Sequence, residues 1–104
     1  DVTAYIQALS SGRLPVRERE VLTRKQQMLE RVMLGLRTSD GIDIIEFEDR
    51  TGQNFLTAFS SLLAHLEAQK LGTLVADDRK RFLLTRSGRA RLDSIVEAFA
   101  DRIL

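Results

Sequence analysis

The segment Met28–Gly41, with the sequence MLERVMLGLRTSDG, constrains what this chain can fold into more than any other stretch. Its apolar residues recur at intervals of three and four, which places them on one face of an α-helix: Leu29, Val32, Met33 and Leu36. The run TSDG at 38–41 consists of residues that favour turns, so we expect the helix to end there. Arg37 lies in the last turn, where the helix dipole favours a cation. The segment therefore predicts an amphipathic helix with one buried face and a sharp stop.

The overall composition indicates one globular domain and excludes several kinds of site. The chain has 104 residues and a net charge of +1, so it has no strong attraction for nucleic acid or for an anionic membrane. No apolar run approaches the ~18 residues that a membrane-spanning helix needs. The sequence has no cysteine and one histidine, which rules out thiolate-bound clusters and multi-histidine metal sites. We expect no catalytic residue and no metal site here, and we interpret the chain as part of a longer cytoplasmic protein.

Apolar periodicity and turn residues predict the order of the elements. In chain order we expect a short helix at 2–9, a linker at 13–16, the central helix ending at 37, helices at 44–51 and 55–70, a β-hairpin with strands at 73–76 and 81–84, and a last helix at about 87–103. Two short helices joined by a turn that contains glycine, followed directly by a hairpin, are typical of a winged helix. The predicted fold is therefore mainly α with a small β-hairpin, a winged-helix-like domain.

Local signals place the helix ends and the core. Asp43 and Asn54 are expected to cap the helices at 44–51 and 55–70, with Gly52 ending the first and Leu71-Gly72 ending the second. In the helix at 44–51 we expect three residues to face inward: Ile44, Ile45 and Phe47. The predicted core collects residues from the apolar stripes and the hairpin: Leu29, Val32, Leu36, Phe59, Leu62, Leu66, Phe82, Leu84, Ile95 and Phe99.

The outward side of the helix at 55–70 argues against DNA recognition. In a winged-helix-like domain this helix would enter the major groove. Its outward face consists of small and mostly neutral residues: Thr57, Ser61, Ala64 and Ala68. Base readout and phosphate contacts need Arg, Lys, Asn or Gln at such positions. We therefore expect no sequence-specific DNA binding, and the small side chains better suit close packing against another domain.

The single histidine and the late arginines are further candidates for a binding site. One histidine can ligate haem, but His65 has no acidic neighbour four residues away to orient it, which favours a surface position. Arg86 and Arg89 lie near the start of the last helix, where the helix dipole disfavours cations. They either bind an anion or are solvated surface charges, and the second interpretation is favoured. No pattern of nucleophile, acid–base pair or phosphate loop indicates catalysis.

Two short patterns in the chain resemble those of a known family. The first comprises Glu30, Leu34, Gly35, Leu36, Arg37, Gly41 and Ile42, and the second comprises Leu84, Thr85 and Gly88. They resemble a glutamate followed by Leu-Gly-Leu-Arg and a later glycine, and a Leu-Thr-x-x-Gly, in the C-terminal domain of oxygen-independent coproporphyrinogen III oxidase-like proteins. This radical S-adenosylmethionine family, HemN/HemW-like, includes a haem-chaperone branch. Leu71-Gly72 departs from the family's usual Gly-Leu at the end of the third helix.

The resemblance implies an accessory domain behind a catalytic barrel. Residues 1–16 would be a short helix and linker leaving that barrel, and residues 17–104 would be the winged-helix-like domain. The barrel would carry a Cys-x-x-x-Cys-x-x-Cys motif that holds a [4Fe–4S] cluster and S-adenosylmethionine. The family oxidase decarboxylates propionate side chains of coproporphyrinogen III, whereas the chaperone branch binds haem. In either case this domain would cover the barrel opening and help to enclose a tetrapyrrole.

The resemblance also directs attention to particular residues and leaves alternatives open. Arg37 is the first candidate for a contact to the barrel or to the substrate, and Arg86 and Arg89 are weaker candidates. The choice between oxidase and chaperone stays open because the discriminating residues would lie upstream. Two other hypotheses are a DNA-binding domain of a transcription regulator and a protein–protein docking module.

Overall fold

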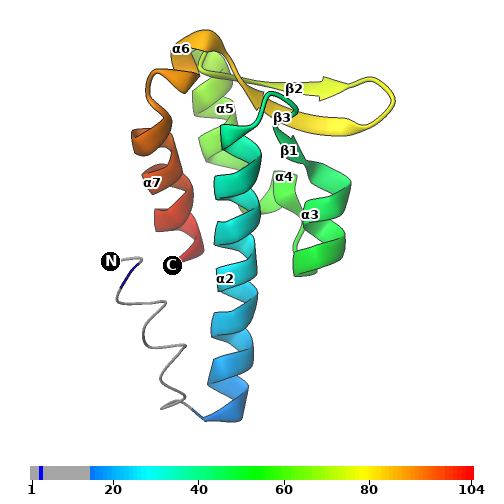
Figure 1. Ribbon diagram of the computed structural model, residues 1–104, viewed down its shortest axis with the longest axis vertical. Helices are drawn as coiled ribbons and strands as arrows, with labels where there is room; N and C mark the ends of the chain where they lie inside the picture. Colours follow the sequence, from blue (N-terminus) through cyan, green and yellow to red (C-terminus); the bar gives the residue numbers. More distant parts are fainter. Residues whose placement is uncertain (1–2, 4–14) are drawn as a thin grey trace.

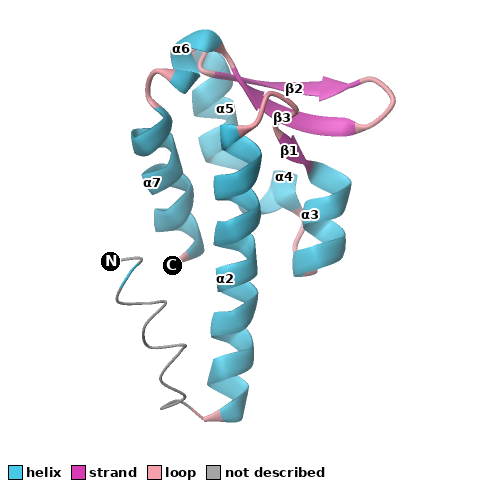
Figure 2. Cartoon of the chain, in the orientation of Figure 1, coloured by secondary structure: helices cyan, strands magenta, loops and turns pink. Residues whose placement is uncertain are grey.

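The computed structural model describes Thr3 and residues 15–104, and this part is mainly α-helical with a small antiparallel sheet (Figures 1 and 2). The helices are α2 (Val16–Arg37), α3 (Ile44–Thr51), α4 (Phe55–Ala58), α5 (Ser60–Ala68), α6 (Arg86–Arg89) and α7 (Leu92–Ile103), and the strands are β1 (Ile42–Asp43), β2 (Gly72–Ala76) and β3 (Lys80–Leu84). The helix expected at 2–9, apart from Thr3, and the first linker residues lie outside the described residues. The predicted helical fold with a hairpin is confirmed.

Helix α2 is the longest described element and ends where the sequence predicts. The amide and hydroxyl groups of Thr38 both donate to the carbonyl of Gly35, at 3.2 and 3.0 Å, which closes the last turn. The residues that it buries are Met28, Leu29, Val32 and Leu36, while Met33 at the edge of the stripe is half-buried. Helix α7 lies alongside α2 and runs in the opposite direction (Figure 1).

The sheet contains a strand that the sequence analysis missed. Strands β2 and β3 form the predicted hairpin, with Leu74 opposite Phe82, and β1 pairs with the other edge of β3. β1 has only two residues, too few to show a period of two. Gly41, just before it, has a φ of +76°, and a Cβ there would collide with the carbonyl oxygen of Phe82. Glycine is therefore required at the turn that brings β1 into the sheet.

Two helices that were predicted as continuous are interrupted. The helix at 55–70 is divided at Phe59, where φ is −119° and ψ is 22°, values outside the helical range. The ring of Phe59 remains buried in the core at this break. The helix at 87–103 is divided into α6 and α7, and the new helix begins after Arg91. The start of α6 is hydrogen-bonded to the chain at Leu71, whereas α7 packs along α2. One straight helix could not make both contacts.

The caps of α3 and α4 are confirmed, and one inward assignment is wrong. Asp43 Oδ1 accepts a hydrogen bond from the amide of Glu46 at 3.0 Å, and Asn54 Oδ1 accepts one from Thr57 at 2.9 Å. Gly52 ends α3 with a φ of +70°. Ile44 and Phe47 are buried, but Ile45 is 50% exposed. Residues three apart share a helix face, so burying Ile44 and Phe47 turns Ile45 outward, together with Glu46.

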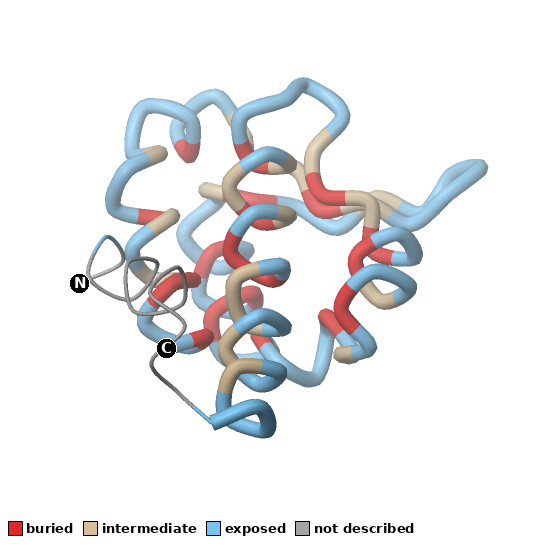
Figure 3. The backbone as a smooth tube through the Cα atoms, turned by 60° about the horizontal axis from the view of Figure 1, so that its bottom comes forward, coloured by how far each residue is buried: buried red, intermediate tan, exposed pale blue. Residues whose placement is uncertain are grey.

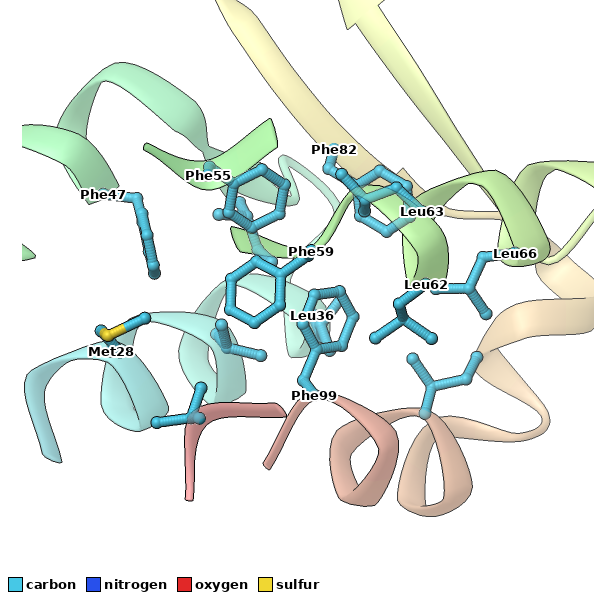
Figure 4. Packing of buried hydrophobic residues seen from close by; sticks show 14 of the residues in the cluster. Met28, Leu36, Phe47, Phe55, Phe59, Leu62, Leu63, Leu66, Phe82 and Phe99 are labelled. Carbon is cyan, nitrogen blue, oxygen red and sulfur yellow. The ribbon is translucent and has the colours of Figure 1, made fainter. Parts of the chain in front are cut away.

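The core is one continuous cluster, and every residue of the predicted core belongs to it. Figure 3 shows in red where the backbone of the described elements is buried. Phenylalanine rings from several elements meet at the centre of the core, as Figure 4 shows. Phe99 of α7 is fully buried, with its ring centroid 4.9 Å from that of Phe59 and 6.3 Å from that of Phe82. The ring of Phe99 therefore joins the last helix to α4–α5 and to the sheet.

Replacing Phe99 by Ala is expected to lower the free energy of unfolding by about 3–5 kcal/mol, because it removes a fully buried ring and leaves a cavity. Ser94→Ala, an exposed position of the same helix, serves as the control and should change stability by less than about 0.5 kcal/mol. Urea melts measure both. A loss below about 1 kcal/mol for Phe99→Ala would contradict this packing.

Helix α5 ends at a left-handed lysine, not at the glycine that the sequence suggested. Lys70 has a φ of +59°, and the amides of Lys70 and Leu71 donate to the carbonyls of Glu67 and Leu66. These are the two hydrogen bonds of a Schellman motif, whose left-handed position is usually glycine. Gly72 instead begins β2 and lies beneath the ring of Phe82, where a Cβ would collide with it.

Lys70→Gly is expected to raise the free energy of unfolding by about 1 kcal/mol, because glycine adopts the left-handed conformation without the steric cost of a Cβ. Gln69→Gly is the matched control one residue earlier, where φ is −85°, and it should instead lower stability by about 0.5–1 kcal/mol. Thermal and urea melts of the two variants should therefore shift in opposite directions. A shift in the same direction would show that Lys70 is not strained.

Candidate functional site

The first family-like pattern holds α2 against β1 at Gly35. A Cβ on Gly35 would lie 2.6 Å from Cγ1 and 2.8 Å from Cα of Ile42, closer than non-bonded carbon atoms can approach. Leu36, the next residue, is buried in the core at 2% exposure. Gly41 provides the left-handed turn described above. These three residues therefore have roles in the folding of the domain itself.

The second pattern holds the start of α6 against the end of α5. Leu84 is buried, and the hydroxyl of Thr85 donates to the carbonyl of Lys70 at 2.7 Å while accepting from the amide of Gly88 at 3.1 Å. The amide of Thr85 donates to the carbonyl of Leu71 at 3.0 Å, and a Cβ on Gly88 would collide with that same carbonyl. The Leu-Thr-x-x-Gly pattern is thus explained by one tight crossing of the chain.

Leu34 and Arg37 are exposed members of the first pattern, as is Glu30, which accepts a hydrogen bond from Gln26 at 3.1 Å. Leu34 is 61% exposed. The side chain of Arg37 is exposed and makes no hydrogen bond or ion pair with any described residue. Being three residues apart, the two side chains lie on the same exposed side of the last turns of α2.

A small cleft lies beside Leu34, between the end of α2 and the start of α3. Its volume is about 150 Å³, and it is lined by Arg31, Leu34, Gly35, Thr38, Gly41, Ile42, Asp43, Glu46 and Phe47. At its rim Arg31 Nη1 lies 2.7 Å from Glu46 Oε1. Small-molecule sites usually have volumes of about 300–1,000 Å³. The cleft is therefore too small to hold a tetrapyrrole and is of a size suited to a side chain.

Charged residues of the hairpin and of the α2–β1 turn are paired with one another. Arg79 lies 3.7 Å from Asp40 and 3.6 Å from Asp43, and Arg81 lies 2.8 Å from Asp77. Arg81 also donates to the backbone carbonyl of Asp40 at 3.3 Å. These contacts hold the hairpin against the loop that follows α2.

The carboxylate of Asp77 stays ionised throughout the physiological range. Hydrogen bonding with Asp78 and with the amide of Arg79, together with the guanidinium of Arg81, lowers the pKa of Asp77 from 3.8 to about 2. The charge of the hairpin turn at Asp77 therefore does not change near neutral pH.

Arg86 and Arg89 are exposed, and their side chains make no hydrogen bond or ion pair within the part of the chain that the structure describes. The amide of Gly88 at the start of α6 is already bonded to the hydroxyl of Thr85. Like Arg37, both side chains are therefore without a partner in the part of the chain that the structure describes.

The family of this chain follows from a comparison with models of known protein families. The family model described as the HemN C-terminal domain matches residues 22–91, a span that includes both patterns and most of the chain. The chain belongs to the HemN C-terminal domain family. Neither the curated proteins nor the solved structures provided a significant match. The family consists of accessory domains of HemN-like radical S-adenosylmethionine proteins and implies an associated N-terminal radical S-adenosylmethionine domain.

Other positions considered in the sequence lie on the surface of this HemN C-terminal domain. His65 is exposed. The small residues on the helix face that was considered for DNA recognition are exposed too: Thr57, Ser61, Ala64 and Ala68. Among residues 15–104 no three His, Asp or Glu side chains gather in a way that could hold a metal ion. None of the described helices combines the length and apolarity needed to cross a membrane.

Sequence reasoning missed the cleft in this HemN C-terminal domain because its walls come from α2, β1 and α3. The one signal available was Leu34, an apolar residue outside the buried stripe of its helix. Such a residue is not needed for the core and is free to serve a contact elsewhere.

Gly35→Ala is expected to lower the free energy of unfolding by about 1–3 kcal/mol, because the added methyl group meets the backbone of Ile42, which cannot move without disturbing the sheet. Glu20→Ala, at an exposed position of the same helix, is the control and should change stability by less than about 0.5 kcal/mol. Denaturant melts give both values. Unchanged stability for Gly35→Ala would disprove the close approach of α2 and β1.

Proposed function

We propose that this HemN C-terminal domain covers the opening of an upstream radical S-adenosylmethionine barrel and forms one wall of a tetrapyrrole site. The parent would be either a coproporphyrinogen III oxidase-like enzyme or a haem chaperone of the same family, acting in the cytoplasm. In this proposal residues 1–16 connect the barrel to a winged-helix-like domain at 17–104. The segment itself contributes surface and positioning, and the chemistry belongs to the barrel.

The observation that carries the proposal is the division within the first family-like pattern. Gly35, Leu36 and Gly41 are required by the packing of the domain, whereas Leu34 and Arg37 point away from it. Residues without an internal partner are available for an external one. The cleft beside them is too small to contain a tetrapyrrole, so the domain supports the role of a wall and not of a complete binding site.

The cofactors of the proposed parent fit the barrel and not this segment. A [4Fe–4S] cluster requires cysteine thiolates, and this chain has no cysteine. When bound in the barrel, the cluster and S-adenosylmethionine would supply the radical chemistry. Arg37 would hold a carboxylate, either of a propionate side chain or of the barrel, because a guanidinium binds carboxylates with two parallel hydrogen bonds.

DNA binding is not favoured as a second function. The face of α4–α5 that would meet the major groove exposes hydroxyl and methyl groups. Arg79 and Arg81 of the hairpin, which could contact phosphates as a wing, are engaged with aspartates. The third hypothesis was a protein–protein docking module. Docking on the barrel would be one such interaction, so this hypothesis is compatible with the proposal.

Arg37→Lys in the full-length protein is expected to weaken tetrapyrrole binding or interdomain docking about five- to tenfold, because lysine keeps the charge but loses the bidentate geometry. Arg50→Lys is the matched control, since Arg50 also lies exposed in the last turn of a helix. Titration with haem and with a porphyrin, together with proteolysis at the domain junction, measures the effect. If the two variants have equal tetrapyrrole affinities and equal rates of proteolysis at the domain junction, Arg37 serves only to stabilise its own helix, by placing a cation at the negative end of the helix dipole.

A further inference from the structure

We infer that residues 2–9 fold back along the first turns of α2 as an antiparallel helix, so that the chain enters the domain through a helical hairpin. Apart from Thr3 these residues lie outside the described part of the structure, and their helix is an expectation from the sequence. The surface that receives them is the apolar side of α2 at 16–27, which contributes no residue to the described core. The inference does not depend on an upstream barrel or on a tetrapyrrole.

The apolar side of α2 is longer than the core that covers it. The residues that α2 buries begin at Met28. Val21 precedes Met28 by seven residues and Val32 by eleven, so it faces the same side, yet it is 45% exposed. In Figure 1 the first turns of α2 extend past the end of α7, the helix that packs along it. A hollow of about 400 Å³ lies there, lined by Arg17, Glu18, Val21 and Leu22.

The start of α2 has little local stabilisation of its own. Pro15 precedes the first turn, and no side chain caps the free amides of that turn. The side chains of residues 16–27 are exposed or half-buried. A few helical turns that lack both a cap and a buried face are marginal in water. This part of α2 therefore needs an apolar partner on the side of Val21.

The segment just before α2 carries a matching face. Its apolar residues follow the spacing of one side of a helix: Val2, Tyr5, Ile6 and Leu9. Thr3, which lies outside this stripe, is helical and exposed. So short a helix is also marginal unless its apolar side packs on another element. The segment and the start of α2 would each supply the contact that the other requires.

Residues 10–15 provide a suitable connection between the two helices. They contain the turn residues Ser10, Ser11 and Gly12, followed by Pro15. Connections of this length are usual between neighbouring antiparallel helices. When extended they can span about 20 Å, whereas the axes of packed helices lie about 8–10 Å apart. A helix at 2–9 would be about 12 Å long, which is shorter than the about 18 Å of α2 at 16–27.

The short connection favours this segment over other occupants. A segment tethered by so few residues is present at its binding surface at a local concentration on the order of mM or higher. A second copy of the chain would have to bind the same surface from dilute solution. An upstream barrel would be attached through residues 2–9 themselves, so it would have to displace them to reach Val21.

The test uses the 104-residue chain and measures hydrogen exchange of the amides at 19–27. Ile6→Asn should increase the exchange rate there about tenfold or more, because a polar side chain weakens the apolar contact that protects these amides. Ala4→Asn places the same residue on the other face of the segment, and it should change the rate less than about threefold. The amides at 32–36, in the core, should keep their rates in both variants.

A reciprocal variant changes the surface of α2 and measures the segment. Val21→Asn should increase the rate of chymotrypsin cleavage after Tyr5 about tenfold or more, because a released segment is accessible to the protease. Gln27→Asn, at an exposed position on another side of the same helix, should leave the cleavage rate unchanged. Unchanged exchange at 32–36 in the Val21→Asn variant would separate release of the segment from unfolding of the domain.

Three results would overturn the inference. The first is that Ile6→Asn and Val21→Asn leave the exchange and cleavage rates of the wild type unchanged. The second is that protection at 19–27 rises with protein concentration and is lost in the monomer defined by sedimentation, because a second copy would then be the occupant. The third is that protection appears only in a longer protein that includes an upstream domain, because that domain would then cover this side of α2.

Discussion

The ring of Phe55 is the contact on which the rest of the structure depends. It lies 5.2 Å from the rings of Phe47 and Phe59 and 6.2 Å from those of Phe82 and Phe99, measured between centroids. All five phenylalanines of the chain therefore meet at one residue. Together they bind α3, the α4–α5 junction, β3 and α7 into one core, and aromatic contacts of this kind add to the burial of apolar area. Helix α2 closes the core with its stripe of Leu and Val residues.

Close approaches at glycine then fix how the outer elements meet this core. Gly35 lets α2 touch β1, and Gly88 lets α6 touch the chain at Leu71. Both glycines belong to the patterns that resemble the family, and both have a steric reason to be there. Exposed positions in the same pattern have no such reason. The contrast between Gly35 and its neighbour Leu34 is what connects the structure of this HemN C-terminal domain to a contact outside it.

The role proposed for the domain depends on its shape and on its surface charge. The described residues offer a rigid frame, a cleft for one side chain and an unpaired guanidinium, and they offer no cluster of metal ligands. The paired charges of the hairpin keep Arg79 and Arg81 occupied, so Arg37 is the cation of this region left for a partner. A domain with these features can shield and position a reaction that takes place in its neighbour, which is the role proposed for it.

The sequence by itself determined the features that depend on near neighbours in the chain. The stripe and stop of α2, the caps at Asp43 and Asn54, the hairpin and the predicted core followed from spacing and residue type, and all are confirmed. Only the tertiary structure decided the strand β1, the breaks at Phe59 and before α7, the outward turn of Ile45 and the cleft beside Leu34. The strand, the two breaks and the cleft depend on contacts between residues that are distant in the sequence, and the side of α3 that faces the core depends on what packs against it. A helical period shows that one face is buried, but it does not show where another element will bend it, pair with it or leave a space beside it.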